Sequence, residues 1–328
     1  MTGTAGVKVD RPGLPFRLRR PTLSSVREYG IVASFAAIFI TLSIASSIFL
    51  TKHNLLNVVD QSSQVGIMAC GETIVFIAGG FDLSIGAVYA LAGVVAAGAS
   101  VHGAPTNLAL FLGLLVGVVV GVVNGVLTTV GRINAFITTI ATQFIVYGIA
   151  LAVTGGLLVT ATASSFTNIG AGSFHEITYE SFVWVGCALA AGVILSRTAL
   201  GRYLYASGGN SEAARLAGVN VAKTRLVAFT LSGVAAAMAG VLEVSQTSTG
   251  EPSAAMGIEL TVIAAVVIGG TSIYGGEGAI WRTVLGVLIL GMITNGFDLL
   301  AVPDFWQDVV RGILIIVAVA IGTVIQRR

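Results

Sequence analysis

Long stretches without any charged side chain place the strongest limit on what this chain can fold into. Residues 29–51 contain no Asp, Glu, Lys or Arg, and neither do residues 83–131. An ionised side chain at the centre of a bilayer costs roughly 3 kcal/mol, and about 20 apolar residues cross the hydrocarbon as a helix. Only 10% of the chain is charged, against about 25% in an average soluble domain. The sequence therefore predicts an all-α polytopic membrane protein.

About ten transmembrane helices account for the apolar runs. Residues 83–131 are too long for one span and are interrupted by a polar segment at 102–107, so they hold two spans. Residues 155–179 are rich in Gly, Ser and Thr, which predicts an external loop with a short re-entrant piece. The predicted spans are residues 29–51, 55–80, two within 83–131, 133–154, 181–195, 226–246, 257–270, 279–295 and 306–325.

The lysine and arginine residues orient these spans, because both prefer the cytoplasmic side of a membrane near span ends. With ten spans and a cytoplasmic amino terminus, fifteen of the seventeen such residues lie inside, and only Lys52 and Arg311 lie outside. We therefore expect both termini to be cytoplasmic. Residues 1–28 are expected to form a disordered, basic cytoplasmic tail, and residues 29–328 the membrane domain.

A polar segment at about 198–225 separates two long apolar blocks and is predicted to lie in the cytoplasm. Within it, Glu-Ala-Ala at 212–214 precedes Gly218, which places a small, flat helical face beside charged residues. Asn210 or Ser211 can cap the start of this helix, and Gly218 is expected to end it. A short helix of this kind outside the bilayer is suited to docking a partner.

The fourth predicted span carries glycines at a spacing of four residues, namely Gly113, Gly117, Gly121 and Gly125. This spacing places them on one stripe of a helix, where another helix can approach closely. Packing within one subunit is the simplest interpretation. The alternative is that the stripe forms a dimer interface or lines a pore.

Two segments end alike, each as an apolar run followed by a pair of glycines. They are residues 74–80 and residues 266–270. Internal duplication is common in transporter folds. The spacing to later Asn-Gly pairs differs between the two halves, so a strict repeat is not supported.

Glu72 lies within the second predicted span, and Asp82 follows it. Acidic residues in a membrane domain are candidates for function. Asp82 follows a glycine pair and can cap the next helix by accepting from the amides of Ser84 or Ile85. A role in gating or on the substrate route is the alternative. Glu72 can face a polar cavity or pair with an arginine. Solvent is expected around the acids near external helix ends, Glu243, Glu259 and Asp298.

Catalysis, nucleotide binding and metal binding are not indicated. The chain has no Gly-x-x-x-x-Gly-Lys-Ser/Thr sequence, so it has no P-loop for ATP. Its three histidines, His53, His102 and His175, fall in predicted external loops without metal-ligand spacing. We expect no catalytic residue, no bound metal or cofactor, and no nucleic-acid partner.

Several motifs carry a resemblance to a known family. Residues 79–86 read Gly-Gly-Phe-Asp-Leu-Ser-Ile-Gly, which closely resembles the Gly-Gly-Ile-Asp-Leu-Ser-Val-Gly of the ribose-type permease subunits of ATP-binding-cassette (ABC) importers. Similar matches occur at residues 131–137, 200–218 and 263–278. Two departures are Phe81 for Ile and Ile85 for Val. At Glu72 the family more often carries Met or Gln.

The resemblance implies a permease domain that works as a homodimer or a paired permease in a bacterial inner membrane. Separate ATPase subunits, which use ATP and Mg, would dock on the cytoplasmic loops. An extracytoplasmic binding protein would deliver ribose, xylose, galactose or a related monosaccharide. Membrane lipid surrounds the complex. The resemblance implies ATPase coupling through Gly209, Asn210, Glu212, Ala213, Ala214, Arg215 and Gly218.

A sugar carries no charge, so its route should offer hydroxyl, amide and aromatic groups. Candidates for the route or its gate are Glu72, Phe81, Asp82, Ser84, Asn124, Gln143 and Asn295. The alternative function is an ion-coupled secondary transporter or channel, which would use Glu72 and Asp82 as proton or cation ligands.

Overall fold

The computed structural model describes residues 23–161, 163–253, 256–303, 305–307, 309–310, 312–313 and 316. Helices dominate these residues, and the strands among them have two residues each. The elements are α1 (Leu23–Ala45), α2 (Lys52–Ile77), α3 (Ile85–Val101), α4 (Thr106–Thr129), α5 (Ala135–Thr154), β1 (Val159–Thr160), α6 (Ser164–Ala171), β2 (Ser173–Phe174), β3 (Ile177–Thr178), α7 (Tyr179–Arg197), α8 (Ala199–Gly209), α9 (Ser211–Leu216), α10 (Val221–Thr247), β4 (Thr249–Gly250), α11 (Ile258–Ile268) and α12 (Ile280–Leu299).

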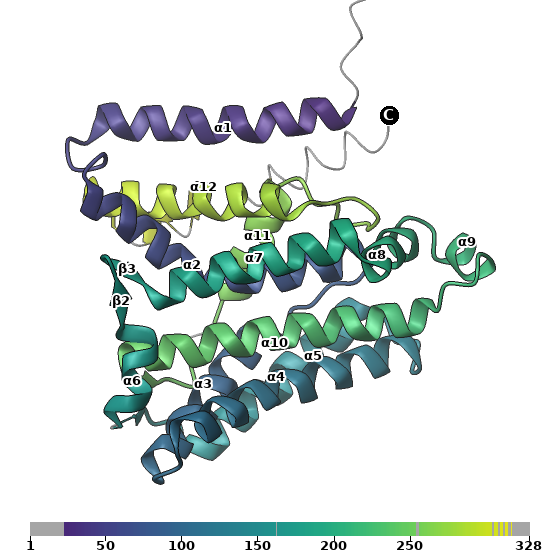
Figure 1. The fold of residues 1–328 in the computed structure, drawn as a ribbon, viewed down its shortest axis with the longest axis horizontal. Coiled ribbons are helices and arrows are strands. Elements are labelled where there is room, and N and C mark those ends of the chain that lie inside the picture. The colour runs from purple at the N-terminus through teal and green to yellow at the C-terminus, as the bar shows by residue number, and fades with distance from the viewer. Residues whose placement is uncertain are drawn as a thin grey trace, which may run out of the picture.

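The long helices lie side by side in one bundle (Figure 1). Helices α8 and α9 lie at one end of it, and α6 with β2 and β3 lies at the other. Five helices of the described part are long and apolar enough to cross a membrane, namely α4, α5, α7, α10 and α12. The prediction of a mostly helical membrane protein is therefore confirmed. Most of the tail at 1–28 and most of the predicted span at 306–325 lie outside the described residues.

Most predicted spans coincide with a helix, and the differences have local causes. The apolar run at 83–131 divides at residues 102–105, between α3 and α4, as its polar residues predict. The first predicted span extends too far, because α1 ends at Ala45 and a turn follows. In that turn the hydroxyl of Thr51 accepts the amide of Asn54 (3.4 Å) and starts α2 three residues earlier than predicted.

The loop predicted at 155–179 is more ordered than its composition indicates. It contains α6 and the β2–β3 hairpin, and β1 pairs with β4 in antiparallel fashion. On the same side of the bundle, Lys52 at the start of α2 forms an ion pair with Glu176 (2.8 Å). The hydrogen bond from Lys52 lowers the pKa of the exposed Glu176 carboxyl.

Helix α10 forms the centre of the bundle, where it packs against α4, α3 and α2. The outer helices α4, α5 and α7 expose large apolar side chains, among them Val119, Phe144 and Leu189. An outer surface of this kind suits contact with lipid. Small residues at the inner contacts allow close approach where burial from water cannot drive association.

The glycine stripe of α4 faces α10 within one protomer. A Cβ added to Gly121 would lie 2.5 Å from the carbonyl oxygen of Phe229, and one added to Gly125 would lie 2.8 Å from the Cα of Leu226. Gly117 and Gly233 pack against each other, so that a Cβ on either would overlap the carbonyl oxygen of the other. The backbones of α4 and α10 are therefore in direct contact.

Candidate functional site

The exposed end of the bundle carries a short, well-capped helix, α9, at the right of Figure 1. The Asn210 side chain accepts the amide of Ala213 (2.9 Å), so Asn210 is the N-cap. Gly218 adopts a φ of 85°, and its amide donates to Arg215, while the next amide donates to Ala214 (3.0 Å each). This pair of bonds is a Schellman motif, which glycine favours because it has no Cβ.

The surface of α9 is open to a partner. Glu212 and Arg215 form an ion pair at 2.6 Å, with both side chains about two-thirds exposed. A pair this exposed contributes little to stability. Ala213 is also exposed, and Leu216 is 81% exposed. An exposed leucine beside small residues and charges is a typical docking surface.

Backbone contacts connect α8 to the end of α2 and to the loop after α11. Gly208 packs directly on the carbonyl oxygen of Ile77 at the end of α2, and an added Cβ would also lie 2.6 Å from the amide nitrogen of Gly276. That amide donates to the same Ile77 oxygen (3.0 Å). We name the contact among Ile77, Gly208, Gly275 and Gly276 the glycine junction.

Side chains reinforce the junction. The Tyr205 hydroxyl of α8 donates to the carbonyl of Gly278 (2.8 Å), and Arg225 of α10 donates to the carbonyl of Ala78 (3.1 Å). These bonds hold α8 to the loop after α11, and α10 to the end of α2.

Helices α2 and α11 end in the same way, as their similar sequences indicate. Gly79 and Gly270 both adopt a φ of 75°. In each case the amide of this glycine and the amide of the next residue donate the two backbone hydrogen bonds of a Schellman motif. The likeness is therefore a shared way of ending a helix inside the protein.

A buried polar cluster joins α2, α3 and α4. The Asp82 amide donates to Glu72 (3.1 Å), and one Asp82 oxygen accepts both the amide (3.0 Å) and the hydroxyl (2.6 Å) of Ser84. Asn124 donates to the same hydroxyl (2.8 Å). Glu72, Asp82 and Asn124 have no exposed surface. The amide bond to Ser84 places Asp82 at the start of α3, and neither carboxyl pairs with an arginine among the described residues.

This geometry predicts different outcomes for two substitutions of Asp82. An asparagine keeps an oxygen that can accept from Ser84, so Asp82→Asn should insert and transport like the wild type. Asp82→Leu leaves a buried amide without an acceptor, which costs about 1–3 kcal/mol, and should lower thermal stability in detergent. Loss of uptake in a stable Asp82→Asn variant would instead favour an ionised carboxylate in transport.

The other route candidates take part in contacts between helices. Asn295 of α12 exchanges two hydrogen bonds with Asn54 of α2 (2.9 and 3.0 Å). Gln143 of α5 donates to Glu259 of α11 (2.8 Å). Phe81 stacks on Phe76, with their ring centroids 4.9 Å apart. These candidates therefore lie at several separate contacts between helices.

The expectation that solvent surrounds the external acids is correct for Asp298, which is exposed, and wrong for two others. Glu259 is only 7% exposed, and Glu243 of α10 accepts a hydrogen bond from Gln64 of α2. Glu180 of α7 is fully buried as well. The burial of Glu180 and Glu243 depends on how α2, α7 and α10 pack, and Glu259 of α11 bonds to Gln143 of α5. No local sequence signal indicates these contacts.

Comparison with known proteins identifies permease subunits of transport systems as relatives of this chain. Residues 54–319 match the family model described as the permease component of branched-chain amino acid transport systems. The chain is 40% identical to the ribose import permease protein RbsC of Escherichia coli (strain K12) over 299 residues, which cover 88% of this chain and 92% of that protein.

Two further relatives show similar coverage. The ribose import permease protein RbsC of Bacillus subtilis (strain 168) is 40% identical over 296 residues, which cover 90% of this chain and 92% of the relative. The L-arabinose transport system permease protein AraH of Escherichia coli (strain K12) is 39% identical over 292 residues, which cover 89% of each chain. No solved structure gives a significant match.

Proposed function

This chain belongs to the permease-component family of branched-chain amino acid transport systems and is a permease subunit of a sugar ABC importer. We propose that it carries a monosaccharide inward as the membrane part of an ATP-driven complex. The observation that carries the proposal is about 40% identity over nine tenths of the chain to permeases named for ribose and L-arabinose. Ribose, xylose, galactose and arabinose are therefore the first sugars to test.

The complex needs subunits that this chain does not supply. We assign ATP hydrolysis, with its Mg, to separate ATPase subunits, and sugar capture to an extracytoplasmic binding protein. The permease acts as a homodimer or with a second, similar permease. Each of these assignments is drawn from the family to which the chain belongs.

The proposed topology has ten spans with both termini in the cytoplasm. The exposed helix α9 lies at one end of the bundle, and the Lys52–Glu176 ion pair lies at the end nearer α6. Basic residues gather in the polar segment that contains α8 and α9, as expected for a cytoplasmic side. This orientation puts α9 where an ATPase can reach it.

Coupling is proposed to run from α9 through α8 to the glycine junction. A docked ATPase would hold the α9 surface that includes Glu212, Ala213 and Arg215. Rigid-body movement of α8 would then shift the ends of α2 and of the loop after α11. Hinged or rocking motion of this kind opens many transporters alternately to each side.

Substitution of Glu212 tests this coupling. Truncation of a central interface residue costs about 2 kcal/mol or more, which is roughly a 30-fold loss of affinity. We therefore expect Glu212→Ala to insert normally, bind the ATPase more weakly and lose sugar uptake. Glu176→Ala is the matched control, because it also breaks an exposed ion pair but lies near the opposite end of the bundle. The measurements are uptake and ATP hydrolysis in the same proteoliposomes.

Two results would contradict the proposal. One is sugar uptake by this chain alone in liposomes that contain no ATPase. The other is labelling of a cysteine at Ser211 by a membrane-impermeant reagent from outside intact cells, because α9 would then face away from ATP. Uptake that follows an imposed ion gradient would favour a secondary transporter instead.

A further inference from the structure

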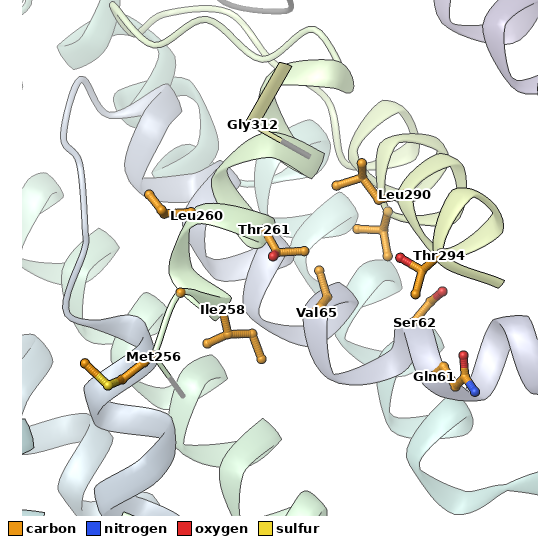
Figure 2. A pocket seen from close by; sticks show the side chains of 13 residues that line it. Gln61, Ser62, Val65, Met256, Ile258, Leu260, Thr261, Leu290, Thr294 and Gly312 are labelled. Atoms are coloured by element: carbon orange, nitrogen blue, oxygen red, sulfur yellow. The ribbon is translucent and has the colours of Figure 1, made fainter. Parts of the chain in front are cut away.

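A cavity of about 590 Å³ lies between α2, α11 and α12 (Figure 2). Its polar lining consists mainly of Gln61 and Ser62 from α2, Thr261 from α11 and Thr294 from α12. The volume falls within the roughly 300–1,000 Å³ that is usual for small-molecule sites. Gln61 and Ser62 belong to the half of α2 that starts at Lys52, away from the glycine junction at its other end. In the proposed topology, this half of α2 lies toward the side from which a sugar would arrive.

The polar groups of this lining have spare hydrogen-bonding capacity. The hydroxyl of Ser62 donates to the Val58 carbonyl (2.6 Å), as is common in helices. Among the residues that the structure describes, the side chains of Gln61, Thr261 and Thr294 form no hydrogen bond. Thr261 and Thr294 are half-buried, whereas Gln61 is exposed. A half-buried polar group without a partner in a membrane is costly, so it marks a place where water or a polar solute enters.

The remaining lining has the chemistry of a site for a neutral solute. The side chains of Val65, Ile258 and Leu290 form apolar patches beside the hydroxyl and amide groups (Figure 2). No charged side chain contributes to the described lining. A sugar ring offers hydroxyl groups at its edge and C–H groups on its faces, and this mixed lining complements both.

We propose that the cavity is a binding station on the sugar route, where Gln61, Thr261 and Thr294 exchange hydrogen bonds with the hydroxyl groups of a monosaccharide. This assignment rests on the proposed function and adds the residues that recognise the solute. It also moves the site away from Asn295 and Gln143, whose amides are already paired with other side chains.

Valine substitutions test the assignment, because valine keeps the shape of threonine and removes its hydroxyl. The transporter is reconstituted in liposomes with its ATPase and binding protein, and uptake of labelled ribose and L-arabinose is measured beside ATP hydrolysis. Thr261→Val and Thr294→Val should each slow uptake of the transported sugar about 2- to 10-fold, and the double variant should slow it more. ATP hydrolysis should continue. Thr154→Val is the matched control, because that hydroxyl bonds to its own helix at Ala150.

The controls distinguish failure of the proposed function from failure of the proposed binding station. If the wild-type complex transports none of the sugars in an ATP-dependent way, the proposed function fails. If the wild type transports one of them and the double valine variant matches it, the binding station fails.

Cysteine labelling covers the case in which the double variant does not insert. Thr294→Cys, in a background with Cys70→Ala and Cys187→Ser, should react with a membrane-impermeant thiol reagent added outside. The transported sugar, supplied with its binding protein, should slow that reaction. Labelling that is insensitive to sugar would overturn the assignment.

Discussion

Replacing Gly208 by alanine should abolish sugar uptake. The added Cβ would overlap the carbonyl oxygen of Ile77 and lie 2.6 Å from the amide nitrogen of Gly276, both of which are backbone atoms that cannot turn away. Relief of the overlap would break the hydrogen bond between these two groups (3.0 Å). Overpacking and a lost buried hydrogen bond together cost about 2–6 kcal/mol. The glycine junction would then open.

Gly192→Ala in α7 is the matched control for this substitution. It adds the same methyl group to a helical glycine, but a Cβ on Gly192 meets no atom within 4 Å. We expect Gly192→Ala to transport like the wild type. Uptake, ATP hydrolysis and co-purification of the ATPase should be measured for both variants. Normal uptake by Gly208→Ala would show that the junction does not transmit movement.

Replacing Gly117 by alanine should destabilise the bundle itself. The Cβ would overlap the carbonyl oxygen of Gly233 and lie 2.6 Å from the Cβ of Ala237, so α4 and α10 would have to separate. Overpacking of this kind costs about 1–3 kcal/mol. Because α10 is the centre of the bundle, the thermal stability of the purified protein should fall, and uptake should fall with the amount of folded protein.

Gly148→Ala in α5 separates this steric effect from the general effect of adding a methyl group. A Cβ on Gly148 meets no atom within 4 Å, and alanine favours a helix by about 1 kcal/mol over glycine. This variant should be at least as stable as the wild type in a melting experiment in detergent. Equal stability of Gly117→Ala and Gly148→Ala would contradict the close contact between α4 and α10.

Local features of the site could be predicted from the sequence because their causes are local. Asn210 starts α9 through a bond to an amide three residues away, and Gly218 ends it with a backbone conformation that glycine favours. The Asp82 bond to the Ser84 amide also spans only two residues. In each case the neighbouring residues determine the geometry.

Contacts across the bundle could not be predicted in this way. The pairs Asn54–Asn295 and Gln143–Glu259 join residues more than 100 positions apart. In a soluble helix, alternation of polar and apolar residues would show which face is buried. A membrane helix is apolar on its lipid side as well as on its core side, so this signal is lost. The acid Glu180 illustrates the effect, because its complete burial follows from packing alone.

By itself, the sequence determined that the chain is a helical membrane protein and that a capped helix lies in the polar segment between its two apolar blocks. It also determined the resemblance to sugar importer permeases. These properties depend on composition, short-range hydrogen bonds and the order of motifs. Only the tertiary structure decided that Gly208 touches the end of α2 and the loop after α11, and that Gln61, Thr261 and Thr294 share one cavity. The physical reason is that both depend on which helix faces meet, and contact between helices selects those faces.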